Sequence, residues 1–108
     1  MEHLTDIILV LSMIPTTEEA TIIGRRVVED KLAACVNIVP GVRSFFFWKG
    51  ALCDENEVLL MMKSCQDVFS DLIHCIRELH SYALPEIVAL PIIGGDEEYL
   101  AWVRSSTI

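Results

Sequence analysis

Cysteine and histidine side chains are the first candidates for chemistry, because thiols and imidazoles bind metals and act as nucleophiles or bases. The four cysteines share no Cys-x-x-Cys spacing, which excludes a zinc ribbon and a thioredoxin-type redox motif. They are Cys35, Cys53, Cys65 and Cys75. His74 and His80 lie six residues apart and point about 120° from each other on one predicted helix, so they cannot chelate one ion. We interpret the cysteines as free thiols of a reducing compartment.

Aromatic residues give a second kind of candidate site. Residues 45–48 read Phe-Phe-Phe-Trp, and such side chains line small-molecule clefts at subunit boundaries. Tyr82 and Glu86 are the predicted polar members of this cleft, with Trp48 in its apolar wall. Packing within a subunit interface is the alternative explanation for the same aromatic cluster.

Two predicted strands and a helix make up the first half of the chain. Residues 5–14 form an apolar run of strand length, and Thr16 with Glu19 predicts a capping box for a helix that ends near residue 31. The next strand covers residues 33–48. Pro40-Gly41 interrupts it, which indicates a bulge or bend because proline cannot donate to a strand ladder.

The second half of the chain is predicted to form another strand, a helix and a last strand, followed by a short helix. A hairpin loop is predicted at Lys49-Gly50 and the polar residues 54–56, which places Cys53 in a turn, and residues 57–63 return as a strand. Ser64 and Asp67 predict the cap of a helix reaching residue 79. After a connector at residues 80–84, Pro85 opens a last strand whose own Pro91 indicates an edge position or a bulge. Asp96 caps a short terminal helix.

The predicted order is therefore β-α-β-β-α-β with an extra C-terminal helix. Two crossover helices of this kind pack on one face of an antiparallel sheet, which is the α+β, ferredoxin-like sandwich. We expect a single domain over residues 1–108.

The hydrophobic fraction of 53% is high for a small protein with one such sheet. All four predicted strands are apolar on both faces, whereas the helices cover only one face. Exposing the other face would forgo burial worth roughly 25 cal/mol per Å². We therefore expect an oligomer that has its sheets inside and its helices outside.

The net charge argues against nucleic acid as a partner, and the length of the apolar runs argues against a membrane. The net charge of −8, from 16 acidic and 8 basic residues, argues against binding nucleic acid. Every apolar run is far shorter than the roughly 20 residues that span a bilayer. The initial MEHLTD has no features of a targeting signal, so a cytoplasmic location is expected.

Four segments, in this order and spacing, resemble the CutA family of divalent-cation tolerance proteins along nearly the whole chain. They are KLAACVNIVPGVRSFFFWKG, EVLLMMKS, HSYALPEIVALPI and GDEEYLAWV. The resemblance implies ferredoxin-like subunits in a tight homotrimer related to the PII signalling proteins. It also implies a role in tolerance of copper and other divalent ions, with no enzymatic activity and no required cofactor.

The same resemblance implies three copper-ligand positions, of which this chain keeps one. Ser12 stands where the family has a cysteine, and Leu79 stands at the histidine position with His80 beside it. Glu86 matches the third ligand. We therefore expect His80 and Glu86 to contribute a weaker metal site at a subunit boundary.

Three classes of function remain open at this point. The leading interpretation is a non-enzymatic trimer concerned with divalent metal ions, with copper as the candidate ion. The alternatives are a PII-like sensor of a small ligand and a trimeric scaffold for a partner protein. A small phosphatase-type enzyme is disfavoured because VLSMIPTTEE, between the first strand and helix, has no glycine or arginine to hold a phosphate.

Overall fold

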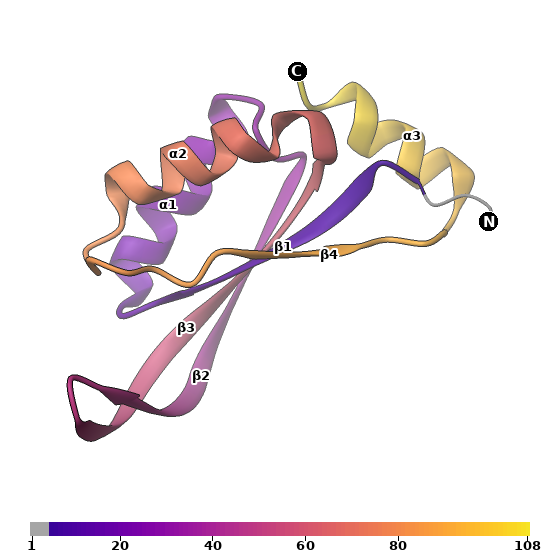
Figure 1. The fold of residues 1–108 in the computed structure, drawn as a ribbon. Helices are drawn as coiled ribbons and strands as arrows, with labels where there is room; N and C mark the ends of the chain where they lie inside the picture. The colour runs from indigo at the N-terminus through magenta and orange to yellow at the C-terminus, as the bar shows by residue number, and fades with distance from the viewer. Residues whose placement is uncertain (1–4) are drawn as a thin grey trace.

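Strands and helices alternate along the chain in the predicted order in the computed structural model, which describes residues 5–108 (Figure 1). Residues 1–4, part of the segment examined for a targeting signal, lie outside this range. The elements are β1 (Ile7–Ile14), α1 (Thr17–Glu29), β2 (Cys35–Trp48), β3 (Ala51–Cys65), a 3-10 helix (Gln66–Val68), α2 (Phe69–Leu79), β4 (Val88–Pro91) and α3 (Glu97–Ser105). The α+β, ferredoxin-like fold is confirmed.

The four strands form one antiparallel sheet in the order β2-β3-β1-β4. The edge position predicted for the last strand from Pro91 is confirmed, although β4 is shorter than expected. Helices α1 and α2 lie over one face of the sheet (Figure 1). The side chains of Val10, Leu60 and Met62 point toward these helices and are fully buried. They form the core between the helices and the sheet.

Side-chain caps begin two of the helices as the sequence predicts. The Thr16 hydroxyl accepts a hydrogen bond from the Glu19 amide at 3.1 Å, and Asp96 accepts one from the Tyr99 amide at 2.9 Å. The second half of the predicted capping box is wrong. The Glu19 carboxylate accepts from the Ser81 amide at 2.8 Å instead, because the connector after α2 passes beside the start of α1.

The cap predicted for α2 is also wrong. Ser64 belongs to β3, where it pairs with Ile8 of β1, and its buried hydroxyl donates to the Leu32 carbonyl at 2.6 Å. The strand continues to Cys65, and a 3-10 turn leads into α2. A tertiary hydrogen bond thus uses the hydroxyl that local sequence assigned to a helix end.

The β2–β3 hairpin closes through two residues only. Lys49 and Gly50 both have positive φ, 53° and 81°, as a tight two-residue hairpin turn requires. The loop predicted at residues 54–56 is wrong, since these residues lie in β3 opposite β2, and Cys53 is likewise in the strand. Asp54 makes a two-bonded ion pair with Arg43 across the strands, at 2.8 and 2.9 Å. Residues 54–56 are therefore polar because they lie on solvent-exposed parts of a strand, and not because they form a loop.

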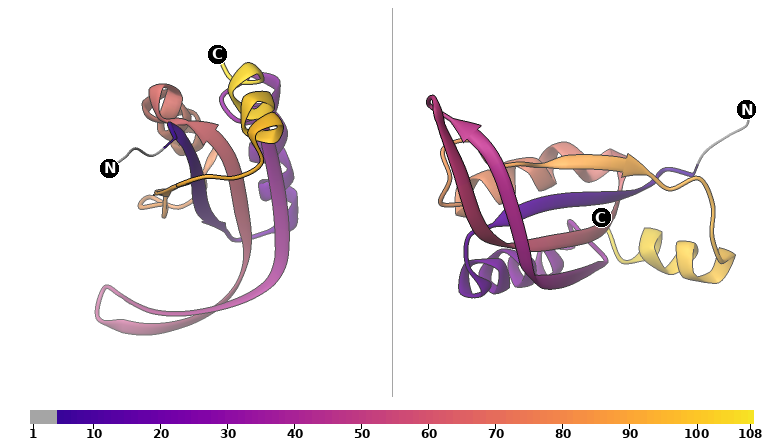
Figure 2. Two further views of the ribbon diagram at one scale, coloured as in Figure 1. Left: turned by 90° about the vertical axis from the view of Figure 1, so that its right-hand side faces the viewer. Right: turned by 90° about the horizontal axis from the view of Figure 1, so that it is seen from below.

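The bulge predicted at Pro40-Gly41 is confirmed. The register shifts between Val39 and Val42, and Gly41 has a φ of 83°. Val39 pairs with Leu59 and Val42 with Glu57, so between these pairs two residues of β2 oppose one of β3. The shift exchanges the faces of β2, and beyond it the hairpin curls out of the plane of the sheet (Figure 2).

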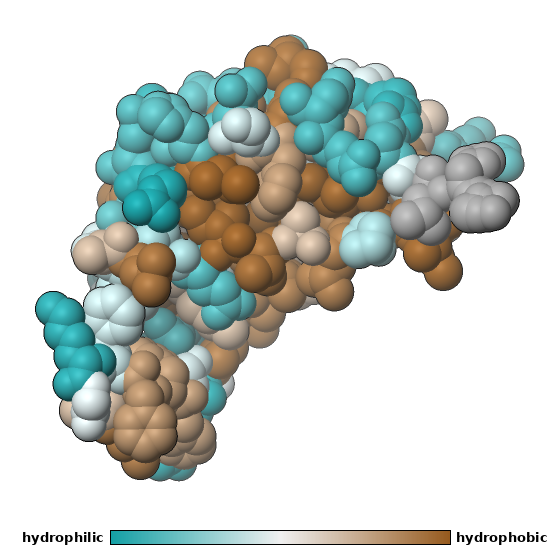
Figure 3. Space-filling model, viewed as in Figure 1, coloured by the Kyte–Doolittle hydropathy of each residue, from teal (hydrophilic) through white to brown (hydrophobic). Residues whose placement is uncertain are grey.

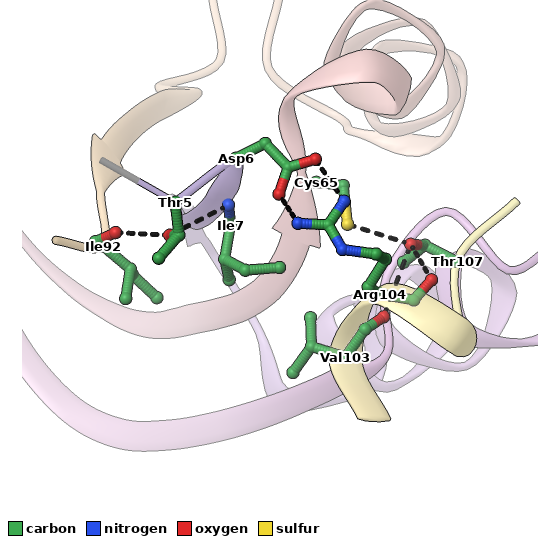
Figure 4. A network of polar contacts seen from close by, with 8 residues as sticks. All are labelled: Thr5, Asp6, Ile7, Cys65, Ile92, Val103, Arg104 and Thr107. Carbon is green, nitrogen blue, oxygen red and sulfur yellow. Dashed lines mark hydrogen bonds and ion pairs between the residues drawn. The ribbon is translucent and has the colours of Figure 1, made fainter. Parts of the chain in front are cut away.

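The sheet face opposite α1 and α2 is only partly covered. At one end, Val103 of α3 packs against Ile7 and Cys65. Arg104 pairs with Asp6, and the Cys65 thiol lies 3.1 Å from the Thr107 hydroxyl, which fixes α3 to the sheet (Figure 4).

The rest of this face carries half-buried or exposed apolar side chains. We call it the open face, and it comprises Leu9, Leu11, Met13, Val39, Leu59, Met61, Val88 and Leu90. Apolar surface lies along the strands and at the hairpin tip, whereas hydrophilic residues lie over the helices (Figure 3).

Candidate functional site

The curled hairpin and the segment between α2 and β4 enclose a cleft of about 430 Å³, which we call the hairpin cleft. Its apolar wall is formed by Met13, Phe45, Phe46, Trp48 and Leu84. Its polar groups are Ser44, Glu57, Tyr82 and Glu86. The structure therefore brings together three of the four residues named from the sequence, namely Trp48, Tyr82 and Glu86.

Glu57 is the cleft residue that the sequence analysis missed. It is 5% exposed, and its Oε2 accepts a hydrogen bond from the Tyr82 hydroxyl at 3.0 Å. A signal for it was present, since Glu57 is in phase with Leu59 and Met61, which point to the open face. A carboxylate in an otherwise apolar face of a strand indicates a functional or paired group.

Tyr82 is held in its protonated form. Burial, the hydrogen bond to Glu57 and the negative charges of Glu57, Glu55 and Glu19 together raise the pKa of Tyr82 to about 12. The phenol therefore remains a hydrogen-bond donor at neutral pH and is no base. It links the 80–86 segment to the hairpin.

His80 lies next to the cleft but does not point a free nitrogen into it. Its ring is fully buried. The Tyr82 amide donates to Nδ1 at 3.0 Å, which places the ring proton on Nε2, and Nε2 donates to the Met13 carbonyl at 2.8 Å. Both nitrogens are thus engaged, and a metal could bind only after one of these hydrogen bonds breaks. The ring positions the connector between α2 and the cleft.

The positions that the resemblance implied as copper ligands do not converge. Ser12 faces the helices, on the side of the sheet away from the cleft, and its hydroxyl is buried without a partner among residues 5–108. Leu79 packs against the core. Within the described part of the chain no three His, Cys, Asp or Glu side chains are grouped to hold a metal ion. One chain therefore does not fit a closed copper centre.

A second hollow adjoins the first on the inner side of the hairpin. It has a volume of about 450 Å³ and shares Phe46, Trp48, Tyr82 and Leu84 with the hairpin cleft. Lys49, Cys53 and Glu55 add polar groups there. The Lys49 ammonium lies 5.9 Å from the centre of the Trp48 ring, within cation–π range. The hairpin tip thus holds a cation against one of its aromatic faces.

Comparison with known proteins decides the family. The profile described as CutA1 divalent ion tolerance protein matches residues 8–106. The chain belongs to the CutA1 divalent ion tolerance family.

Relatives and solved structures agree with this assignment. The divalent-cation tolerance protein CutA of Thermus thermophilus is 46% identical over 98 residues, which cover 91% of this chain and 95% of that protein. A solved structure of the T. thermophilus protein superposes with a TM-score of 0.92 at 44% identity and covers 94% of this chain and 99% of its own.

A second structure, described as the periplasmic divalent cation tolerance protein CutA of Archaeoglobus fulgidus, has a TM-score of 0.90 at 36% identity. It covers 93% of this chain and 97% of its own. The likeness therefore extends over nearly the whole chain. Among residues 5–108, no helix is long and apolar enough to cross a bilayer.

Proposed function

We propose that this chain is the subunit of a non-enzymatic homotrimer that acts in the tolerance of divalent ions and binds its ligand in the hairpin cleft. The observation that carries the proposal is the buried carboxylate of Glu57, which bonds to Tyr82 and lines the same aromatic-walled cleft as Glu86. The family supplies the physiological role. The cleft supplies the place where a cation or small molecule would act.

The open face supports the homotrimer. Its apolar side chains lie on all four strands, and in the described part of the chain only one end of this face is covered, by α3. Contact between the open faces of identical subunits would bury this surface, in the sheets-inside arrangement of PII-like trimers. The cleft would then lie at a subunit boundary.

The lining of the cleft supports a non-catalytic role. The charged side chains that line it are Glu57 and Glu86, so the described cleft offers no Lys or Arg to stabilise a phosphate or another anion in a transition state. Tyr82 stays protonated at neutral pH. These properties disfavour the phosphatase alternative and favour binding.

Copper is the candidate divalent ion, through Glu86 at the boundary between subunits. Because the His80 nitrogens are engaged within the chain, we expect weak carboxylate-based binding and no tight copper centre. The free thiols of Cys35, Cys53, Cys65 and Cys75 are consistent with a reducing, cytoplasmic location.

Three measurements test the proposal. Sedimentation should give the mass of three chains, and calorimetric titration with Cu²⁺ and Zn²⁺ should give stoichiometric heats that Glu86→Ala reduces. Growth of a strain lacking this protein in graded Cu²⁺ should be restored by the native chain and less well by Glu86→Ala. A monomer in dilute solution, or equal growth with and without the protein, would contradict the proposal. Retention of a partner protein with no ion binding would favour the scaffold alternative.

A further inference from the structure

The hairpin cleft has walls of two kinds. Its carboxylates, Glu57 and Glu86, are negative, and the described lining contains no positive side chain. The rest of the lining is mainly aromatic and aliphatic. A ligand complementary to this surface carries positive charge on an apolar body.

Glu57 has one carboxylate oxygen that accepts no hydrogen bond from residues 5–108. The residue is 5% exposed, and only one of its carboxylate oxygens, Oε2, accepts a hydrogen bond within residues 5–108. No Lys, Arg or His of the described chain forms an ion pair with it; the described ion pairs of the hairpin involve Arg43 and Asp54. The second oxygen accepts no hydrogen bond from the described residues, so it can accept one from a charged donor that enters the cleft.

The size of the cleft and the ligand atoms that line it favour an organic cation over a metal ion. A volume of about 430 Å³ exceeds what a bare metal ion fills and lies in the range of small-molecule sites. A hard divalent ion takes roughly six or more oxygen ligands, whereas this cleft presents two carboxylates among aromatic rings. An ammonium group needs fewer oxygen contacts and gains from aromatic faces.

The hairpin itself shows this attraction. The Lys49 ammonium lies 5.9 Å from the Trp48 ring centre, and the Arg43 guanidinium carbon lies 5.0 Å from the Phe45 ring centre. The Trp48 ring faces the cleft, whereas Arg43 and Phe45 lie on the outer side of the hairpin. The Lys49–Trp48 contact thus shows that one of the rings that an entering ammonium would contact attracts a cation.

We propose that the hairpin cleft binds an organic ammonium compound, with its charged nitrogen between Glu57 and Glu86 and its apolar part against Phe46 and Trp48. The inference rests on the proposed function, since it names the class of ligand for the same cleft. Tyr82 takes part by holding Glu57 in place through its hydroxyl.

The test uses three probes of equal size and different charge on the purified full chain. Benzylamine is a cation at neutral pH, benzyl alcohol is neutral and benzoate is an anion. Calorimetry and tryptophan fluorescence should show saturable binding of benzylamine, about tenfold weaker binding of benzyl alcohol and no binding of benzoate. Equal affinity for the amine and the alcohol, or no saturable amine binding, would overturn the inference.

Matched variants locate the binding. Glu57→Gln keeps the oxygen that accepts from Tyr82 but removes the charge, and Glu86→Gln removes the charge of an exposed side chain with little risk to folding. Each should weaken benzylamine binding by about fivefold or more, whereas Glu98→Gln on α3 should leave it unchanged. Unchanged affinity in both cleft variants would place the amine elsewhere and refute the assignment.

Cu²⁺ titration and sedimentation on the same samples separate this inference from the proposed function. A trimer that binds Cu²⁺ but not benzylamine refutes the ammonium site and leaves the proposed function standing. Amine binding in a protein that neither binds divalent ions nor affects growth in copper supports the site and refutes the divalent-ion role.

Discussion

Tyr82 and Glu57 form the contact that joins the hairpin to the 80–86 segment. Because the folded protein raises the pKa of Tyr82 above its ordinary value of 10, to about 12, the neutral phenol is favoured by folding. This contribution to stability is fully present below pH 10. It is lost as the pH rises from 10 through 12, since the unfolded chain ionises first.

A spectrophotometric titration of the tyrosines checks this. The chain has two tyrosines, and Tyr82 should ionise near pH 12 in the native protein. Tyr82→Phe should remove that transition, while Tyr99→Phe should leave it. Glu57→Gln should lower the midpoint, because the charge of Glu57 disfavours the phenolate. A midpoint that does not move in Glu57→Gln would contradict a role for the Glu57 charge and leave burial and the charges of Glu55 and Glu19 as the causes.

His80 gives a second prediction at this scale. Replacement by alanine removes a buried ring and leaves the Met13 carbonyl and the Tyr82 amide without partners. We expect His80→Ala to lower the free energy of unfolding by about 2–4 kcal/mol in a denaturant titration at fixed protein concentration. His74→Ala is the control, because that side chain is 78% exposed and should change stability by less than about 0.5 kcal/mol. Equal effects would contradict a structural role for His80.

Individual site residues were predictable where the sequence marks them as unusual. Trp48 stands in an aromatic run, and Tyr82 and Glu86 flank a proline in a connector. Glu57 was not singled out, because it is the first residue of the predicted strand 57–63 and directly follows the polar residues 54–56. The bonds of His80 could not be predicted, since its partner Met13 is 67 residues away along the chain.

At the scale of elements, the bulge in β2 decides which side chains reach the cleft. Before it, Cys35, Asn37 and Val39 share the open face, and after it Val42, Ser44 and the following even-numbered residues do. Phe46 and Trp48 thus face the same side as Glu57. Without the shift, Phe45 and Phe47 would take their places.

Gly41 allows this shift through its positive φ. An added Cβ would contact nothing within 4 Å, so Gly41→Ala tests backbone strain alone. We expect a loss of about 1 kcal/mol in the free energy of unfolding. Gly94→Ala is the matched control, because that site is equally open but has no positive φ. Equal stability of the two variants would show that the bulge tolerates a side chain.

The order of strands and helices was predictable, because each has its own spacing of apolar residues and is bounded by proline, glycine or capping residues. The bulge followed from Pro40-Gly41 in the same way. The loop expected at residues 54–56 and the Ser64 cap were wrong. Both predictions rested on the turn and capping preferences of polar residues, without contacts to distant parts of the chain. In the structure Asp54 pairs with Arg43 across the hairpin, and Ser64 bonds to Leu32 from another element.

At the scale of the whole molecule, the distribution of apolar surface is the main feature. Phe45, Phe47 and Leu52 are 62–75% exposed on the outer side of the hairpin. Together with the open face they form more apolar surface than a stable single subunit of this size would leave in water. The sequence predicted this excess from its two-sided strands, but it could not show that α3 covers one end of the second face.

Phe47→Asp tests whether the hairpin tip is buried in the assembly. A carboxylate placed there in an interface would be desolvated without a partner, so we expect dissociation or aggregation in sedimentation velocity. Ile22→Asp on α1 is the control, since Ile22 is 61% exposed on the helical side and should leave the assembly intact. Sedimentation of Phe47→Asp at the mass of the parent would show that this side of the tip is free.

The two-residue turn at Lys49-Gly50 and the strict pairing of residues 42–57 have a consequence for redesign of the arm. Adding one residue to each strand beyond the bulge would turn every later side chain over and move Trp48 to the outside. Adding two residues to each strand would preserve the inward set and lengthen the arm. Grafted hairpins should therefore retain their inner lining only when they grow in steps of two residue pairs.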